Sequence, residues 1–464
     1  ARVAAPIRAA QQPALGNSAR ASAGRAGPLA LGGLCVVYLA LALLWAAPGS
    51  NLVLATAGGS PGWLLGPLRF GGIERMANGS LGGPLFYAGL WLALALYVVV
   101  LLRRADLRAR TVLWTIAGLH LLFLLAPPLL SQDVFSYIAY ARLGVEHSLN
   151  PYTHSPSDIP MDAIYPFAGS KDASSVYGPV FTLLTYPLSP LGVPAAFWVL
   201  KVVTAAASFG VVLLVWRTAE LLGRDPVLPA MIVGLNPHVV VHVVGGAHNE
   251  ALMMLVAMGG VLAWVAGRRT LGPAITAAGA GVKATSLLFA PYFALAQTGR
   301  PRPEARRAVL RAVVASALAL ALVALIGLVG FGSHALDAVN VLSNNQGRTS
   351  RWSFPYKTAQ LLGAVLPGDR LDYRDAVRSI YAAVFAGVAI WLMWRTWRGD
   401  DPIRMAGWAT FAILVASAWL VPWYLLWLLP LAALARDRRL VIASIALSAW
   451  TLVIAVPLGT FGYG

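Results

Sequence analysis

Charged residues are scarce in this chain of 464 residues: they form 11% of the sequence, whereas hydrophobic residues form 58%. Soluble domains carry about 25% charged residues, so this composition excludes an ordinary soluble protein. The hydrophobic runs are long and lack the alternation of barrel strands, and in a bilayer such runs satisfy their backbone groups as helices. The sequence therefore predicts an all-α, polytopic membrane protein with about thirteen transmembrane helices of roughly 20 residues each.

Cysteine is nearly absent as well, because Cys35 is the single one. An intramolecular disulfide is therefore excluded, and cysteine usage gives no information about the compartment. Acidic residues are few: 18 Asp and Glu against 35 Lys and Arg give a net charge of +17. The basic residues gather in short turns such as 103–110, while the segments assigned to the other side of the membrane are close to neutral. This is the positive-inside pattern, so we interpret the charge as orienting the chain in a membrane and not as a nucleic-acid site.

The expected topology follows from these turns. Residues 1–27 contain arginines and no acid, which predicts a disordered cytosolic tail without a removable signal. Residues 28–464 form a single transmembrane domain whose C-terminus lies outside. Its long outer loops are about 49–83, 131–193 and 332–375. The expected single spans are 28–48, 84–102, 111–130, 194–216, 227–244, 251–266, 308–331, 376–396, 403–420, 423–435 and 440–458.

Two apolar segments do not fit a single span. Residues 271–298 have basic residues on both flanks, so both ends belong inside, and we predict a hairpin of two short helices with its tip at 279–285. Residues 177–192 are short and interrupted by three prolines. They are predicted to be a juxtamembrane or re-entrant element.

Asp133 lies where the third span leaves the bilayer. A carboxylate there is partly desolvated, which favours a raised pKa and a role as a base. The same residue suits the N-cap of a short surface helix over 134–143. The two roles are compatible, and residue type alone does not choose between them.

His248, Asn249 and Glu250 form a polar turn between two spans at the expected outer face. Ionisable residues at a membrane boundary are functional candidates. We expect hydrogen bonds to a sugar or to Asp133, and a solvated turn is the alternative. The spacing lacks an HExxH-type ligand pair, so no metal is indicated, although the sequence does not rule out a divalent ion. No other cofactor is expected.

Lys283 is the one basic residue inside the apolar hairpin. A cation at that depth costs about 2.5–3.5 kcal/mol, which predicts a partner anion such as a lipid phosphate. The glycines around it lack the spacing of a nucleotide-binding loop, so we exclude a nucleotide site.

The second long outer loop supplies further cations and rings. Arg348, Arg351 and Lys357 suit phosphate contacts, and Tyr356 suits a sugar contact. Anchoring to anionic lipid head groups explains the cations equally well. Trp423 and Tyr424, near the outer end of a later span, fit an aromatic belt, and they also fit stacking on a sugar or a prenyl chain.

Four motifs together resemble a known family. They are Asp-Val-Phe-Ser-Tyr-Ile-Ala-Tyr-Ala-Arg-Leu-Gly (133–144), Asn-Pro-Tyr (150–152), Tyr-Gly-Pro (177–179) and His-Asn-Glu (248–250). The chain resembles the actinobacterial α-(1→6)-mannosyltransferases that use polyprenyl phosphate mannose (the MptB type), which are GT-C glycosyltransferases. The resemblance implies a GT-C fold with long outer loops and juxtamembrane helices. It also implies an active site at the outer face of the cytoplasmic membrane.

The resemblance implies a donor, an acceptor and roles for the candidate residues. The donor is a polyprenyl (decaprenyl) phosphate mannose, the acceptor is a lipid-anchored mannan of the lipomannan type, and Asp133 matches the position of the family's base. The expected donor-phosphate ligands are Arg142, Lys283, Arg348, Arg351 and Lys357. The expected sugar or acceptor contacts are Tyr137, Tyr177, His248, Asn249, Glu250, Tyr356, Trp423 and Tyr424.

One feature departs from the wider superfamily, in which some members carry an adjacent Asp-Glu pair. Here Val134 follows Asp133, so we expect a base that works alone or with help from Glu250. Two alternatives stay open from the sequence: a GT-C transferase of another lipid-linked sugar, such as arabinose or glucose, and a lipid-linked sugar transporter or flippase. Transporters place their binding residues at the midplane, whereas most polar residues here fall at one face.

Overall fold

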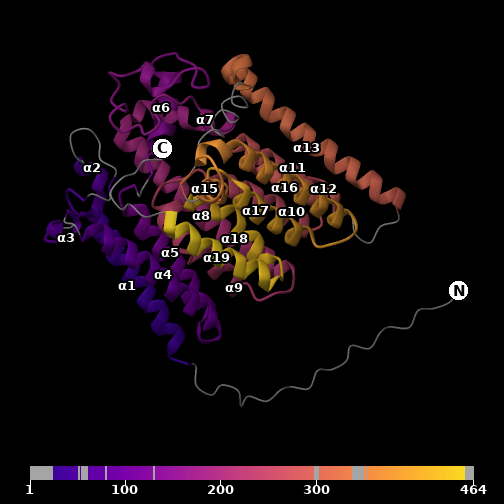
Figure 1. The fold of residues 1–464 in the computed structure, drawn as a ribbon, viewed down its shortest axis with the longest axis horizontal. Helices are drawn as coiled ribbons and strands as arrows, with labels where there is room; N and C mark the ends of the chain where they lie inside the picture. Colours follow the sequence, from indigo (N-terminus) through magenta and orange to yellow (C-terminus); the bar gives the residue numbers. More distant parts are fainter. Residues whose placement is uncertain are drawn as a thin grey trace.

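The computed structural model describes residues 24–50, 53, 61–69, 71–78, 81–128, 131–296, 302–336, 350–351 and 353–454. Within these residues all regular elements are helices, which confirms the all-α class (Figure 1). Most of the expected tail and the last ten residues lie outside the described part. Helix α1 (Ala26–Ala46) packs against α4 (Gly82–Leu102) and α5 (Ala109–Leu125), and α5 packs against α8 (Gly192–Leu221).

Five helical stretches are long and apolar enough to cross a membrane. They are Ala26–Ala46, Gly82–Leu102, Pro179–Leu221, Pro303–His334 and Leu371–Trp397. A sixth is formed if α9 (Val227–Gly234) and the π-helix η5 (His238–Val244) count as one span. The count of thirteen spans stays a prediction.

The span expected over 227–244 is broken in the middle, because α9 and η5 meet at a bend of 49°. Pro237 lies in the break between them. A proline lacks the backbone N–H of a helical hydrogen bond and disfavours helix at the preceding residue. The bend turns the chain toward the polar turn 245–249, which precedes α10 (Glu250–Val265).

The hairpin predicted over 271–298 is present. Helices α11 (Leu271–Ala278) and α12 (Ala290–Leu295) pack side by side and are joined by short 3-10 turns. Trp264 touches both of its ends: a Cβ on Gly272 would meet the Cβ of Trp264 at 2.6 Å, and Trp264 Nε1 donates to the Phe293 carbonyl at 3.0 Å. Both ends therefore return to one end of α10, as the basic flanks required.

The second outer loop contains more helix than the sequence pattern indicated. Helix α15 (Phe354–Val365) forms inside the expected loop 332–375, and α16 (Arg370–Trp397) begins six residues before the expected span. Both starts are capped: the Ser353 side chain accepts from the Tyr356 N–H, and the Asp369 side chain accepts from the Leu371 N–H. The caps satisfy otherwise unpaired helix N–H groups, which allows helix in a polar segment.

Segments that are distant in the sequence contact one another in the fold. Gly27 N–H donates to Asp106 Oδ2 at 3.2 Å, and Arg224 donates to the Leu434 carbonyl. Helix α6 (Asp133–Val145), the loops after it and α7 (Pro179–Thr185) form the cap at the top of Figure 1. The remaining long helices are α13 (Arg302–Phe331), α17 (Pro402–Ala416), α18 (Leu425–Leu434) and α19 (Arg438–Ile454).

Candidate active site

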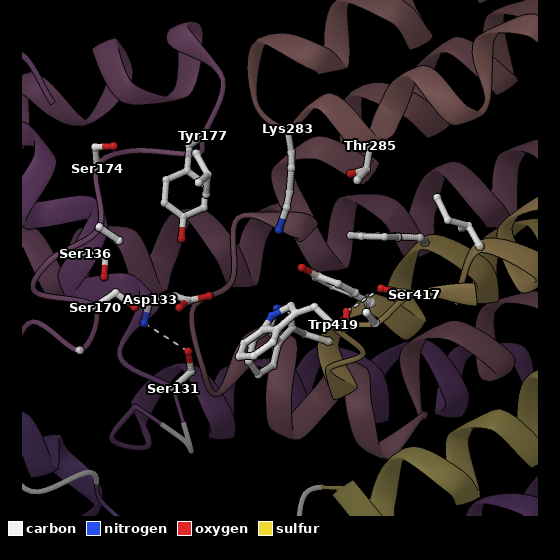
Figure 2. A pocket seen from close by; sticks show the side chains of 18 of the residues that line it. Ser131, Asp133, Ser136, Ser170, Ser174, Tyr177, Lys283, Thr285, Ser417 and Trp419 are labelled. Atoms are coloured by element: carbon white, nitrogen blue, oxygen red, sulfur yellow. Dashed lines mark hydrogen bonds between the residues drawn. The ribbon is translucent and has the colours of Figure 1, made fainter. Parts of the chain in front are cut away.

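A cavity of about 1200 Å³ lies beneath the cap. Three parts of the chain form its walls: the α6 side with the following loop, the tip of the α11–α12 hairpin, and residues 375–385 of α16 together with 413–427. Figure 2 shows Asp133 and Tyr177 on one side and Ser417 and Trp419 on the other, with the Lys283 side chain reaching between them. Segments separated by some 280 positions in the sequence therefore share one cavity.

Asp133 is the first residue of α6. The N-cap role expected for Asp133 is wrong, because Gln132 occupies the cap position and the helix begins one residue earlier than expected. Most of its side chains are buried, so α6 is not a surface helix. The Asp133 N–H donates to Ser131 Oγ at 3.2 Å. Its side chain is 36% exposed, toward the cavity. The N-terminus of a helix carries partial positive charge, so this position stabilises an ionised carboxylate.

The expected raised pKa of Asp133 is wrong. Burial does raise the pKa of this carboxyl, but the close His248 ring and the positive charge of Lys283 outweigh it, and the net pKa is below the ordinary value. His248 Nδ1 lies 3.3 Å from Asp133 Oδ2. His248 and Lys283 are far from Asp133 in the sequence, so the residues around Asp133 indicate only the effect of desolvation on its pKa. Asp133 is therefore ionised at neutral pH.

The turn before α10 brings His248 and Glu250 under Asp133. Ala247 has a positive φ of 55°, a conformation uncommon outside glycine, and α10 begins at Glu250. His248 is fully buried and stacks on Trp423 at 3.8 Å between ring centroids. Its Nδ1 also lies 3.9 Å from Glu250 Oε2. The ring thus stands between two carboxylates, both at helix N-termini, and links the Asp133 and Glu250 positions.

Lys283 pairs with Glu250 at the tip of the hairpin. The Lys283 side chain is 15% exposed and the Glu250 side chain is 1% exposed, so the pair is largely removed from water. The ammonium also lies 5.0 Å from the Tyr424 ring centroid, within cation–π range. The anion expected for this buried cation is thus supplied in part by the protein itself.

Tyr177 and Gly178 attach the cap to the hairpin. Tyr177 lines the cavity and contacts Tyr137 edge-to-face at 4.8 Å. Tyr137 lies behind it, and its hydroxyl accepts from the Asn249 N–H at 3.3 Å. Gly178 N–H donates to the Val282 carbonyl at 2.9 Å, next to Lys283. The Tyr-Gly-Pro motif therefore sets the distance between the cavity wall that carries Asp133 and the wall that carries Lys283.

Gly178→Ala is expected to disrupt the cavity. A Cβ there would lie 2.3 Å from the Gly281 carbonyl oxygen, and backbone atoms cannot rotate away as a side chain does. The φ of −66° suits alanine, so the cost is steric and is on the order of 1–3 kcal/mol. We expect a lower Tm in detergent and a turnover reduced at least tenfold.

Gly259→Ala is the matched control, because no atom lies within 4 Å of the added Cβ. Equal Tm values for the Gly178 and Gly259 variants would contradict the close-approach role of Gly178.

The Asn-Pro-Tyr motif (150–152) stabilises the cap through hydrogen bonds. Asn150 Oδ1 accepts from the Tyr152 N–H at 3.1 Å, which is the turn chemistry considered for it. Asn150 Nδ2 donates to the Phe331 carbonyl at 2.8 Å, and the Tyr152 hydroxyl donates to the Tyr177 carbonyl at 2.9 Å. The motif ties the cap to the end of α13 and to Tyr177.

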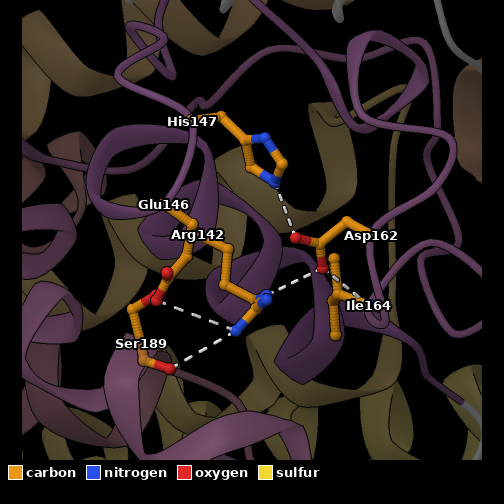
Figure 3. A network of polar contacts seen from close by, with 6 residues as sticks. All are labelled: Arg142, Glu146, His147, Asp162, Ile164 and Ser189. Atoms are coloured by element: carbon orange, nitrogen blue, oxygen red, sulfur yellow. Dashed lines mark hydrogen bonds and ion pairs between the residues drawn. The ribbon is translucent and has the colours of Figure 1, made fainter.

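Arg142 does not reach the cavity. Its Nε donates to Asp162 Oδ1 at 2.7 Å, and His147 Nε2 lies 2.7 Å from Asp162 Oδ2 (Figure 3). Burial raises the pKa of the Asp162 carboxyl, but hydrogen bonds from Arg142 and His147 lower it further, and the net shift is downward. This network fastens the C-terminal end of α6 to the loop that follows. Nothing in this geometry favours the expected phosphate role of Arg142.

The remaining candidates divide between two places. Trp423 and Tyr424 line the cavity, whereas Asn249 is buried behind its wall. Arg351, Tyr356 and Lys357 are described but are not among the lining residues. Arg348 lies outside the described residues. The structure thus assembles the Asp133, His248, Glu250 and Lys283 cluster, and the two second-loop cations that it describes, Arg351 and Lys357, do not line the cavity.

The sequence reasoning missed two cations on the cavity wall, Lys171 and Arg378. Arg378 was assigned to the interior of a span, and Lys171 to an undifferentiated loop. A charged pair at 375 and 378, one turn apart at the outer end of an apolar helix, was the available signal. Among the described residues, no group of three or more His, Cys, Asp and Glu is placed to hold a metal ion.

Known proteins share these segments. The profile of the family "Alpha-(1->6)-mannopyranosyltransferase, N-terminal domain" matches residues 36–299, and that of the "MptB C-terminal domain" matches residues 359–463. Alpha-(1->6)-mannopyranosyltransferase A of Mycobacterium tuberculosis is 29% identical over 378 residues, covering 77% of this chain and 70% of that protein. Alpha-(1->6)-mannopyranosyltransferase B of Corynebacterium glutamicum is 24% identical over 382 residues, covering 73% and 62%. No solved structure matches. The chain therefore belongs to the MptA/MptB family of α-(1→6)-mannopyranosyltransferases, a family of membrane glycosyltransferases.

Proposed function

We propose that the chain is an inverting GT-C mannosyltransferase at the outer face of the cytoplasmic membrane. It transfers mannose from polyprenyl phosphate mannose to a lipid-anchored mannan in α-(1→6) linkage. The observation that supports this most directly is the ionised Asp133 facing a large cavity that also holds Lys283. A base and a cation on facing walls suit an acceptor hydroxyl and a departing phosphate.

The proposed reaction is a single displacement. The oxygen of the acceptor 6-hydroxyl bonds to the anomeric carbon of mannose while the bond from that carbon to the phosphate oxygen breaks. Asp133 takes the hydroxyl proton, and the electron pair of the broken bond leaves with the polyprenyl phosphate. The hydroxyl becomes more acidic as its oxygen bonds to carbon, so a carboxylate of low pKa still accepts the proton in the transition state. His248 holds the carboxylate at 3.3 Å.

The leaving phosphate needs a positive charge close to it and does not need a proton. Phosphate departs as an anion, so the second carboxyl that glycosidases use as a general acid is unnecessary. Lys283 is the proposed electrostatic stabiliser of the developing charge, with Glu250 fixing its ammonium. Glu250 thus positions the cation and is not itself a second base.

A panel of donors tests this function. The purified protein in lipid nanodiscs is given radiolabelled mannose, glucose or arabinose on polyprenyl phosphate, or a nucleotide-linked mannose, with a short α-(1→6)-mannan acceptor. We expect transfer from polyprenyl phosphate mannose only, and a product that an α-(1→6)-specific mannosidase cleaves. Transfer from the nucleotide donor, or movement of the lipid across a bilayer without a product, would refute the proposal.

Lys283→Gln is expected to affect the donor more than the acceptor. The glutamine keeps length and hydrogen bonding but removes the charge, and a charge-assisted contact corresponds to roughly a tenfold to hundredfold change. We expect KM for the donor to rise by that factor while KM for the acceptor changes less than threefold. Lys357→Gln, on α15 outside the cavity lining, is the comparison. A change confined to the acceptor KM would remove Lys283 from the phosphate site.

A further inference from the structure

The cavity wall formed by α16 and α17 changes character along its length. Asp375, Arg378 and Ser379 lie toward the outer start of α16, and Ala382 and Phe385 follow one and two turns further in. Positions 375, 378, 382 and 385 recur at helical spacing, so they lie on one face of α16. Ile413 on α17 and Trp427 on α18 extend the same wall. The wall is polar at its outer end and apolar inward.

Arg378 is the cation at the junction of these two parts. Its side chain is 24% exposed, and its Nη1 lies 3.5 Å from Asp375 Oδ1. Asp375 is 74% exposed, so the Arg378–Asp375 pair is screened by solvent and is weak. Lys283, in contrast, pairs with a fully buried Glu250. The Lys283 ammonium alone therefore leaves a phosphodiester in this cavity under-compensated, and Arg378 supplies a planar donor suited to phosphate.

The other side of α16 faces outward. Ile380 and Val384 are 60% and 61% exposed, and only 11% of this helix's apolar window is buried. An apolar helix surface exposed in a membrane protein contacts lipid chains. The exposed face and the cavity-lining face of α16 belong to the same helix, so α16 separates the lipid from the cavity.

We propose that the α16–α17 wall binds the polyprenyl phosphate part of the donor. Arg378 contacts the phosphate, and Ala382, Phe385 and Ile413 contact the first isoprene units. This inference rests on the proposed function and adds a division of labour to it. The segment matched by the N-terminal family profile carries Asp133 and Lys283, and the segment matched by the C-terminal profile selects the lipid.

Arg378→Gln tests the phosphate contact. We expect KM for the donor, and Ki for free polyprenyl phosphate as a competing product, to rise about 10- to 100-fold, with KM for the acceptor within threefold. Arg374→Gln is the matched control: it removes the same charge one turn earlier, contacts the same Asp375 at 3.2 Å, and is not a lining residue. Equal Ki values for wild type and Arg378→Gln would overturn the phosphate contact.

Ala382→Phe tests the lipid path. The added ring occupies the wall one turn below Arg378 and should raise Ki for polyprenyl phosphate at least tenfold. Ala383→Phe adds the same volume at the exposed neighbouring position, outside the lining, and should leave Ki within threefold. Similar Ki values for the two variants would contradict the path.

Photocrosslinking locates the lipid without any turnover. Polyprenyl phosphate with a diazirine in its first isoprene unit is bound to the wild-type protein in nanodiscs, and labelled peptides are identified by mass spectrometry. We expect labels within 378–385 and 413–419, reduced by Arg378→Gln. Saturable labels elsewhere overturn this inference and leave the proposed function standing. Absence of both labelling and inhibition by polyprenyl phosphate overturns the two together.

Discussion

Asp133→Asn is expected to lower kcat by roughly a thousandfold, because general-base assistance contributes about 10²–10⁴ in rate. Asparagine keeps the shape and the place at the start of α6 but cannot accept the proton. Donor and acceptor KM values should change little, since neither substrate is held mainly by this carboxylate. The measurement is mannose transfer in nanodiscs under saturating donor, with Tm recorded to show that the fold is kept.

Asp172→Asn is the control for Asp133→Asn. It removes one negative charge from the lip of the same cavity and should reduce kcat less than tenfold. Near-normal turnover in Asp133→Asn would sink the assignment of the base. Equal losses in the two variants would show a general effect of cavity charge instead.

The pH dependence of Asp133 follows from the direction of its shift. Its pKa is lowered in the folded protein, so the carboxylate becomes protonated at a lower pH than an ordinary aspartate does. We expect kcat to show no acidic limb between pH 5 and 8 from this group. A raised pKa would have placed such a limb near neutrality. His248→Gln removes the ring at 3.3 Å and should move the limb upward.

Glu250→Ala is expected to have the largest effect on stability, on the order of 3 kcal/mol. Removal of one member of a buried ion pair leaves the other charge without compensation, and this costs more than the pair itself contributes. Glu250 is fully buried, so its loss also opens a cavity beneath Asp133. We expect a markedly lower Tm and reduced yield of folded protein in detergent.

The double variant Glu250→Ala/Lys283→Met separates charge from volume. It removes the unpaired cation while keeping an apolar stem, so it should recover part of the lost Tm without recovering transfer. Recovery of transfer would exclude Lys283 from the proposed chemistry. A double variant no more stable than Glu250→Ala alone would show that the two side chains do not act as a pair.

Hydropathy and the placement of charges are local properties, so the sequence alone shows them. They predicted the helical membrane class, the α11–α12 hairpin from its two basic flanks, and a short helix that starts at Asp133, although that helix is buried and not on the surface. The motif resemblance predicted the family that the profiles match. Helix starts inside polar loops were missed, because the caps at Ser353 and Asp369 depend on short-range hydrogen bonds and not on hydrophobic runs.

By itself the sequence determined that this chain is a polytopic helical membrane protein, and it singled out Asp133, His248 to Glu250 and Lys283 as unusual polar residues. Only the tertiary structure decided that these residues meet, that Arg142 serves Asp162 while Arg378 lines the cavity, and that the pKa of Asp133 is lowered. The physical reason is that the interaction between two charges depends on the distance between them. Asp133 and Lys283 are 150 positions apart in the sequence, and the distance between them is fixed only once the helices have packed.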